Sequence, residues 1–474
     1  MTLKIYDSPA RTLRDFHPLI DGKVGIYLCG ATVQGSPHIG HMRSAVAFDV
    51  LRRWLMRRGY EVTLIRNVTD IDDKILNKSS EAGCSWWAWA YTFEQEFNAA
   101  YDALGIIRPT YEPHATAHIP EQIALIERLI ERGHAYATDA GNVYFDVSSQ
   151  PDYGSLTNQR VGDLAIDESE SEPDKRNPHD FALWKRAKES EPDTAKWETR
   201  WGLGRPGWHL ECSAMSGKYL GESFDIHAGG IDLRFPHHEN EQAQSHGAGY
   251  GFAQYWMHNA WVTIDGEKMS KSLGNSLTVA NILKEYPAVL VRFALGTVHY
   301  RSTVAYSDKT LHEAGAVWDR LKGFVERAAS AVGEIPAEEL MLLPGDLPEE
   351  FVLAMDDDIN VSAALAVIHE HVKRGNSALA EGQQATVRIE QLLVRSMLDV
   401  LGLDPLSPQW RSGSSEGSAV MNALDTLVKD VLDKRAKARA DKDWATADAM
   451  RDLLAGAGIS VADSADGATW KLGE

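Results

Sequence analysis

The sequence predicts an α/β fold that begins with a parallel sheet and continues into an α-helical bundle and a small C-terminal module. A short apolar run at residues 24–29 precedes a loop with Gly and Pro, and a helix-period stretch follows over about residues 41–58. Residues 61–66 supply the next strand. This order of strand, helix and strand indicates a parallel sheet, whose ligands bind beyond the carboxyl ends of the strands.

The helical bundle is predicted by apolar residues that recur at helical spacing beyond about Arg301. Two stripes carry this pattern, namely Val317, Leu321, Phe324, Val325 and Ala328, and then Ile389, Leu392, Leu393, Met397 and Val400. Pro, Gly and Ser residues then predict a flexible linker before a last module of about fifty residues. The predicted division is a sheet domain, a helical region, a linker and a terminal module at residues 1–300, 301–404, 405–418 and 419–474.

Composition excludes several classes of protein. The chain has 474 residues and only three cysteines, too few for the disulfide framework of a secreted scaffold, and this number fits a reduced, cytoplasmic compartment. We find no export signal at the N-terminus and no run of eighteen apolar residues that would span a membrane. Lys and Arg number 48 against 68 Asp and Glu, a net charge of −20, so an anionic partner must be met by a local basic surface.

Two short motifs carry the first chemical signal. The loop after the first strand contains His38 and His41 in the string HIGH, at the start of the predicted helix. A helix N-terminus has free backbone N–H groups, and the glycine between the two histidines allows a ligand to approach closely, so this end of the helix could bind a polyphosphate. The two histidines could instead be ordinary surface or capping residues. The second motif is KMSKS, with Lys268 and Lys271 in a glycine-flanked loop. Each string has a chance probability of roughly one in several hundred or less.

Together the two motifs resemble the signatures of the class I aminoacyl-tRNA synthetases. The resemblance implies a Rossmann-like catalytic domain with a connective α/β insertion at about residues 110–200. It also implies that His38, His41 and Lys271 bind ATP with Mg²⁺, and that the catalytic set is His38, His41, Lys268 and Lys271. Such a reaction needs positioning and cationic stabilisation of the triphosphate, which these residue types can supply.

A third group of residues predicts a metal site. His237 and Glu241 are spaced i, i+4 and would share one face of a helix. With Cys212 and the strand-end Cys29, they offer four ligands of the types that zinc prefers. Spacing alone leaves the set open, because the neighbouring His238 or Glu239 could serve equally well.

The strings RPGWHLECSAM and FPHHENE resemble the cysteinyl branch of the class I synthetases. That resemblance implies one Zn²⁺ per chain, bound by Cys29, Cys212, His237 and Glu241, which selects the thiolate of the substrate cysteine without a separate editing site. It further implies a cysteine pocket formed by Gly30, Thr69, Trp208, His227 and Asp232. Thr69 could instead cap a helix, and Trp208 could be a packed aromatic. The branch has a glycine where this chain has Ala228.

The C-terminal module carries the best local candidate for contact with RNA phosphate. Residues 434–442 hold five basic side chains against Asp441 alone, a local charge of +4, although a solvated helix would look the same. The module resembles the anticodon-binding end of bacterial members of the branch. The candidate tRNA-binding residues are Lys434, Arg435, Lys437, Arg439 and Trp444.

The resemblance therefore implies a ligase that uses ATP to activate L-cysteine and transfers it to tRNA(Cys), and a cytoplasmic monomer is expected. A ligase that joins cysteine to an amino sugar shares the same motifs but is shortened at the anticodon end. A non-catalytic tRNA- or nucleotide-binding relative, and a zinc-binding structural protein, are two further alternatives. Loss of a signature lysine or of a zinc ligand would mark the non-catalytic relative, and the sequence retains them all.

Overall fold

The computed structural model describes residues 2–160, 172–264, 267–268, 277–411, 416–464 and 467–472. The chain forms two compact units, Met1–Pro405 and Leu406–Glu474. In the first unit a four-stranded parallel sheet has the order β11-β10-β3-β4. Its strands are β3 (Lys23–Leu28), β4 (Glu61–Arg66), β10 (Ser223–Gly230) and β11 (Phe252–Asn259).

The predicted parallel pairing is confirmed, with Ile26 of β3 beside Leu64 of β4 on one side and Ile226 of β10 on the other. The apolar run forms this strand because both of its faces are covered, as is usual in parallel sheets. Helix α1 (Ile39–Arg57) connects β3 to β4, close to the predicted span. The α/β fold class is therefore confirmed, and the loop between β3 and α1 lies at the carboxyl edge of the sheet.

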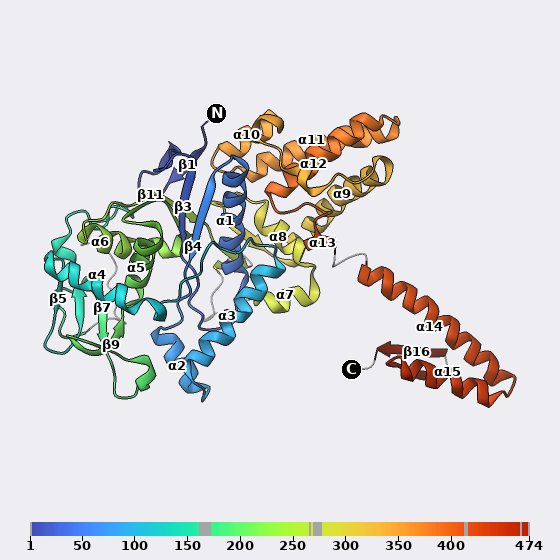
Figure 1. The fold of residues 1–474 in the computed structure, drawn as a ribbon, viewed down its shortest axis with the longest axis horizontal. Helices are drawn as coiled ribbons and strands as arrows, with labels where there is room; N and C mark the ends of the chain where they lie inside the picture. The colour runs from blue at the N-terminus through green and yellow to red at the C-terminus, as the bar shows by residue number, and fades with distance from the viewer. Residues whose placement is uncertain are drawn as a thin grey trace. The chain divides into compact units, whose positions relative to one another are not determined.

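An antiparallel sheet with the order β5-β6-β7-β9-β8 is inserted between β4 and β10. Its strands are β5 (Ala135–Ala137), β6 (Val143–Phe145), β7 (Phe181–Arg186), β8 (Trp197–Thr199) and β9 (Gly202–Pro206). The helices between β4 and β10 are α2 (Asp73–Glu81), α3 (Trp86–Ala103), α4 (Ile119–Glu131) and α5 (Trp208–Leu220), and α6 (Glu239–Gly247) lies between β10 and β11. In Figure 1 the inserted sheet and α4 to α6 lie on one side of β3 and β4.

On the other side lie α1 and the helices that follow the sheet (Figure 1). They are α7 (Val279–Glu285), α8 (Ala288–Gly296), α9 (Asp308–Val332), α10 (Glu349–Asp356), α11 (Val361–Ala380) and α12 (Gln384–Val400). The remaining strands of the unit are β1 (Lys4–Asp7), β2 (Thr12–Asp15), β12 (Val262–Ile264), β13 (Glu267–Lys268) and β14 (Val304–Tyr306). No helix among the described residues is long and apolar enough to cross a membrane.

The buried face of α12 differs from the predicted stripe. Ile389, placed in the stripe, is 57% exposed, whereas Arg395 is fully buried. Arg395 makes two hydrogen bonds to Asp404, at 3.0 and 2.8 Å, and one to the carbonyl oxygen of Ile335. The helix thus turns a polar side chain inward because its partners lie there, and an apolar periodicity does not detect such partners.

Helix α1 is attached to the rest of the first unit by buried arginines. Arg43 donates hydrogen bonds to four backbone carbonyls at the end of α8 and in the loop before β14, those of Leu295, Val298, His299 and Ser302. Further along, Asp49 pairs with Arg292 of α8 at 2.5 Å, and both side chains are buried. These contacts fix the helix that begins at the sheet edge.

The second unit consists of a helical hairpin and a two-stranded ribbon. Its elements are α13 (Pro408–Arg411), α14 (Glu416–Ala440), α15 (Trp444–Gly456), β15 (Ile459–Ser464) and β16 (Gly467–Leu472). The short helix α13 lies within the residues predicted as a linker. The hydrophobic core of the second unit is formed by Val428, Leu432, Leu454 and Ile459, and Trp470 packs against them.

Replacing Asp49 with Ala would leave the buried guanidinium of Arg292 without its carboxylate. Because an uncompensated charge in the interior is costly, we expect Asp49→Ala to lower the free energy of unfolding by about 3–5 kcal/mol. Urea unfolding followed by tryptophan fluorescence measures the change. The control Glu339→Ala removes an exposed ion pair with Arg388 and should cost less than about 1 kcal/mol. Equal losses in the two variants would contradict the importance of the buried pair.

Candidate active site

A cavity of about 340 Å³ opens where β3, β10 and β11 end and α1 begins. Of the residues predicted to form the site, six line this cavity: Cys29, Gly30, His38, His41, Trp208 and Asp232. Gly30 allows a close approach of two chain segments, since a β-carbon there would lie 1.7 Å from the carbonyl oxygen of Asn67. Residues of the first motif and residues near Trp208 and Asp232, which are distant in the sequence, therefore meet at one edge of the parallel sheet.

The two histidines of the first motif stack at the start of α1. Their ring centroids are 3.6 Å apart with an interplanar angle of 22°. The backbone N–H of His38 donates to Nδ1 of His41 at 3.2 Å, so the pair also caps the helix. The histidine rings therefore border the cavity at the positive end of the helix dipole, an arrangement suited to phosphate oxygens.

Four side chains from separate elements meet beside the cavity. The ligand atoms of Cys29, Cys212, His237 and Glu241 all lie within 4.8 Å of one another. Cys29 follows β3, Cys212 is on α5, Glu241 is on α6, and His237 lies in the turn before α6. The two sulfur atoms are 3.9 Å apart, and Nε2 of His237 lies 3.0 Å from Oε1 of Glu241.

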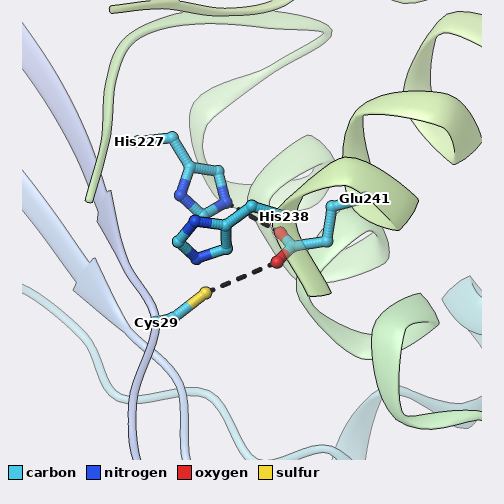
Figure 2. Close-up of side chains that lie close together, drawn as sticks. All are labelled: Cys29, His227, His238 and Glu241. Carbon is cyan, nitrogen blue, oxygen red and sulfur yellow. Dashed lines mark hydrogen bonds and ion pairs between the residues drawn. The ribbon is translucent and has the colours of Figure 1, made fainter. Parts of the chain in front are cut away.

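A second group, drawn in Figure 2, consists of Cys29, His227, His238 and Glu241. It shares Cys29 and Glu241 with the first group. Nε2 of His227 lies 2.7 Å from Oε2 of Glu241, so His227 orients the carboxylate from behind. Nδ1 of His238 is hydrogen-bonded to Nε2 of His258 at 2.8 Å, so His238 belongs to a hydrogen-bond network that continues to Ser8.

Three observations favour the group with two cysteines for zinc. Thiolates are strong zinc ligands, and only this group offers two. Nδ1 of His237 lies 2.9 Å from Nδ1 of His209, an outer contact that holds the ring with Nε2 toward Glu241. Glu239, the other alternative ligand, accepts hydrogen bonds from Gly154 and Thr157 instead.

The electrostatics of the cluster fit a divalent cation. Burial raises the pKa of Glu241 to about 7 and that of Cys212 to about 12. Burial also raises the pKa of Cys29 and lowers that of His237 to about 3, so this imidazole is neutral and able to bind a metal. Burial disfavours the negatively charged forms of the carboxyl and thiol groups. A bound cation would stabilise these anionic forms by compensating their negative charge.

Other predicted pocket residues have different surroundings. Thr69 and His227 are not among the described residues that line the cavity. The hydroxyl of Thr69 donates to the buried carboxylate of Glu211, and Asp72 caps α2, so the alternative of Thr69 as a helix cap is wrong. Trp208 both lines the cavity and stacks on His237, with ring centroids 4.4 Å apart.

Sequence reasoning missed several lining residues, including Gln34, Arg66 and Lys74. Arg66 is held over the ring of Tyr101 at 3.7 Å and pairs with Glu112 at 2.6 Å. Its position at the carboxyl end of a predicted strand was a signal that could have identified it.

The second motif is only partly described. Lys268 belongs to β13, whose backbone pairs with Thr263, and its side chain lies outside the described part. Lys271 lies outside the described residues altogether.

The candidate RNA-binding residues lie in the second unit. Four of them, Lys434, Arg435, Lys437 and Arg439, are on α14, and Trp444 begins α15 with 60% of its surface exposed. Lys434 also pairs with Asp430 at 2.6 Å, which offsets part of the local positive charge.

Three family models match the chain. Residues 15–316 match the family described as tRNA synthetases class I (C) catalytic domain, and residues 350–405 match the DALR domain. Residues 421–470 match the cysteinyl-tRNA ligase anticodon binding domain. The chain belongs to the cysteinyl-tRNA synthetase family. Members of this family are aminoacyl-tRNA ligases, and the earlier resemblance is confirmed.

Relatives in the cysteinyl-tRNA synthetase family are similar along the whole chain. The chain is 61% identical to the cysteine–tRNA ligase of Beutenbergia cavernae over 473 residues, which covers 100% of this chain and 99% of the relative. It is 54% identical to that of Streptomyces avermitilis over 475 residues, with 100% of both chains covered. A structure of Mycobacterium tuberculosis methionyl-tRNA synthetase with methionyl-adenylate shares the fold, with a TM-score of 0.57 and 16% identity over 84% of this chain and 93% of that one.

The buried cluster predicts the number of protons released when Zn²⁺ binds. At about pH 8 we expect about two protons per metal, one from each thiol, because Glu241 is then largely ionised and His237 is neutral. At about pH 6 the release should rise to about three, since the Glu241 carboxyl is then protonated before binding. Calorimetry in buffers of different ionisation enthalpy measures the number. Release that stays the same at both pH values would contradict Glu241 as a ligand.

Proposed function

We propose that this enzyme activates L-cysteine with ATP to form cysteinyl-adenylate and transfers the cysteinyl group to the 3′ end of tRNA(Cys). The observation that carries the proposal is the buried cluster of two cysteines, a histidine and a glutamate that adjoins the histidine-bordered cavity through Cys29. Family membership supports the reaction class, and the cluster supports cysteine as the amino acid.

In the first step the carboxylate of cysteine attacks the α-phosphorus of ATP, and the bond to the leaving pyrophosphate breaks. The N-terminus of α1 with His38 and His41 would bind the triphosphate, which would enter with Mg²⁺. Lys268 and Lys271 would stabilise the charge that develops on the leaving group. Asp232 lines the same cavity and offers a carboxylate for the ammonium group of the substrate.

Selection of cysteine would depend on Zn²⁺ held by Cys29, Cys212, His237 and Glu241. When bound, Zn²⁺ supplies a borderline-soft cation that prefers a thiolate to the hydroxyl of serine. His209 and His227 would orient His237 and Glu241 through their hydrogen bonds. Trp208 would close one side of the pocket, because it stacks on His237 and lines the cavity.

In the second step a hydroxyl of the terminal adenosine of tRNA attacks the carbonyl carbon of the adenylate and AMP leaves. The match of residues 421–470 to an anticodon binding domain supports tRNA as the acceptor over an amino sugar. The basic residues of α14 would contact RNA phosphates there. The monomeric state and the cytoplasmic location stay predictions from the resemblance.

Transfer of labelled cysteine to acid-precipitable bulk tRNA, with ATP and magnesium, tests the proposal beside a parallel serine reaction. We expect charging with cysteine only. Pyrophosphate exchange with cysteine but no charging would instead favour the amino-sugar ligase. Absence of both activities would favour a non-catalytic relative.

The variant Cys212→Ser removes one ligand of the cluster while leaving the ATP-binding histidines intact. We expect cysteine-dependent pyrophosphate exchange to fall at least about a hundredfold, because the metal and with it the substrate thiol are less firmly held. The affinity for ATP, measured by equilibrium dialysis, should change less than about twofold. Equal losses of both properties would indicate a folding defect or a wrong ligand.

A further inference from the structure

A second hollow, of about 280 Å³, lies beside the active-site cavity. Its lining includes three arginines, Arg11, Arg234 and Arg301, which come from three separate parts of the chain. The lining contains no carboxylate, although the chain as a whole has 20 more acidic than basic residues. We call this site, defined by the three arginines, the arginine hollow.

The three guanidinium groups keep hydrogen-bonding capacity. Nε of Arg301 donates to Asp358 at 2.6 Å and its guanidinium lies 4.3 Å above the ring of Tyr6, which holds it in one orientation. Arg11 donates one hydrogen bond, to the carbonyl oxygen of Thr157. Within the described part of the chain, the guanidinium of Arg234 has neither a hydrogen bond nor an ion pair.

The floor of the arginine hollow adds no negative charge. Ser8 and His258 are both buried there, and the hydroxyl oxygen of Ser8 lies 2.6 Å from Nδ1 of His258. The other ring nitrogen of His258 is hydrogen-bonded to His238. Of the carboxylates in the described residues, only Asp358 pairs with any of the three arginines, so about two positive charges are uncompensated in the hollow.

The arginine hollow and the active-site cavity share one wall. Ala260 lines both of them. In the segment after β10, Asp232 faces the active-site cavity, whereas Ile231 and Arg234 face the hollow. A group bound in the hollow would therefore lie next to the cavity in which the substrates are proposed to bind.

We propose that the arginine hollow binds a phosphate group, and that its source is the backbone of tRNA near the acceptor end. Planar guanidinium forks match phosphate oxygens, and a volume of this size holds a phosphate group together with waters. The net charge of −20 repels a polyanion from most of the surface, so RNA must be held at local concentrations of positive charge. The inference rests on the proposed tRNA-charging function.

The test compares the full-length enzyme with Arg11→Gln, Arg234→Gln and the double variant. Affinity for tRNA(Cys) is measured over a range of salt concentrations, beside cysteine-dependent pyrophosphate exchange in the absence of tRNA. We expect the double variant to bind tRNA about tenfold or more weakly, with the salt dependence of log affinity reduced by about one for each arginine removed. Pyrophosphate exchange should stay within about twofold of the wild type.

Two controls separate charge from folding. Arg200→Gln removes an exposed arginine of the inserted sheet, outside the arginine hollow, and should leave tRNA affinity unchanged. Arg234→Lys keeps the positive charge but not the planar fork, so it should keep the salt dependence of the wild type and recover only part of the affinity that Arg234→Gln loses. Thermal unfolding of each variant identifies any loss that comes from misfolding.

The outcomes distinguish the source of the phosphate group. A raised KM for pyrophosphate with unchanged tRNA binding would support the phosphate site but assign it to the free leaving group. If the folded variants show unchanged tRNA affinity and unchanged pyrophosphate kinetics, the inference is overturned. Normal charging of tRNA by the wild-type enzyme would in that case still support the proposed function. A wild-type enzyme that exchanges pyrophosphate but does not bind tRNA would contradict both the RNA source and the proposed function.

Discussion

The site depends on a carboxylate that the fold places entirely away from water. Glu241 is fully buried, and its two oxygens lie against His227, His237 and Cys29. A group in such surroundings needs compensating partners, because burial alone opposes its charge. The neighbouring elements α5, α6, β3 and β10 converge on this point and bring ligands of the types that zinc binds. Selectivity for sulfur would then follow from the need of the buried Glu241 carboxylate for a compensating partner, because the zinc ion that meets this need also binds the substrate thiolate.

Helix α1 connects this interior to the reaction with ATP. Its first turn carries the stacked histidines, and its middle is held by Arg43 and by the pair of Asp49 with Arg292. Near its end, Trp54 donates to Asp356 of α10 at 3.0 Å. A single helix is thus attached to the sheet edge, to α8 and to the helical region, which keeps the phosphate-binding end in a fixed position.

Strands β3 and β4 and the helix between them could be predicted from the sequence, because short apolar runs flank a stretch of helical periodicity. Strands β10 and β11 of the same sheet were not predicted. The four proposed ligands were recognised from their residue types, but spacing could not separate His237 from His238. The choice depends on the contact of His237 with His209, which is 28 residues away in the sequence. The buried face of α12 was predicted wrongly for a related reason, since Arg395 is turned inward by Asp404. The arginine hollow was not predicted, because its three arginines are distant in sequence and follow no pattern.

Loading the enzyme with Co²⁺ in place of the proposed Zn²⁺ tests the central claim most directly, because a cobalt–thiolate bond has a charge-transfer absorption that nitrogen and oxygen ligands lack. The account predicts that this band is present in the cobalt enzyme and grows when L-cysteine is added, since a third sulfur joins those of Cys29 and Cys212. Addition of serine should leave it unchanged. A band that does not respond to cysteine, or responds equally to serine, would contradict selection of the substrate through its sulfur.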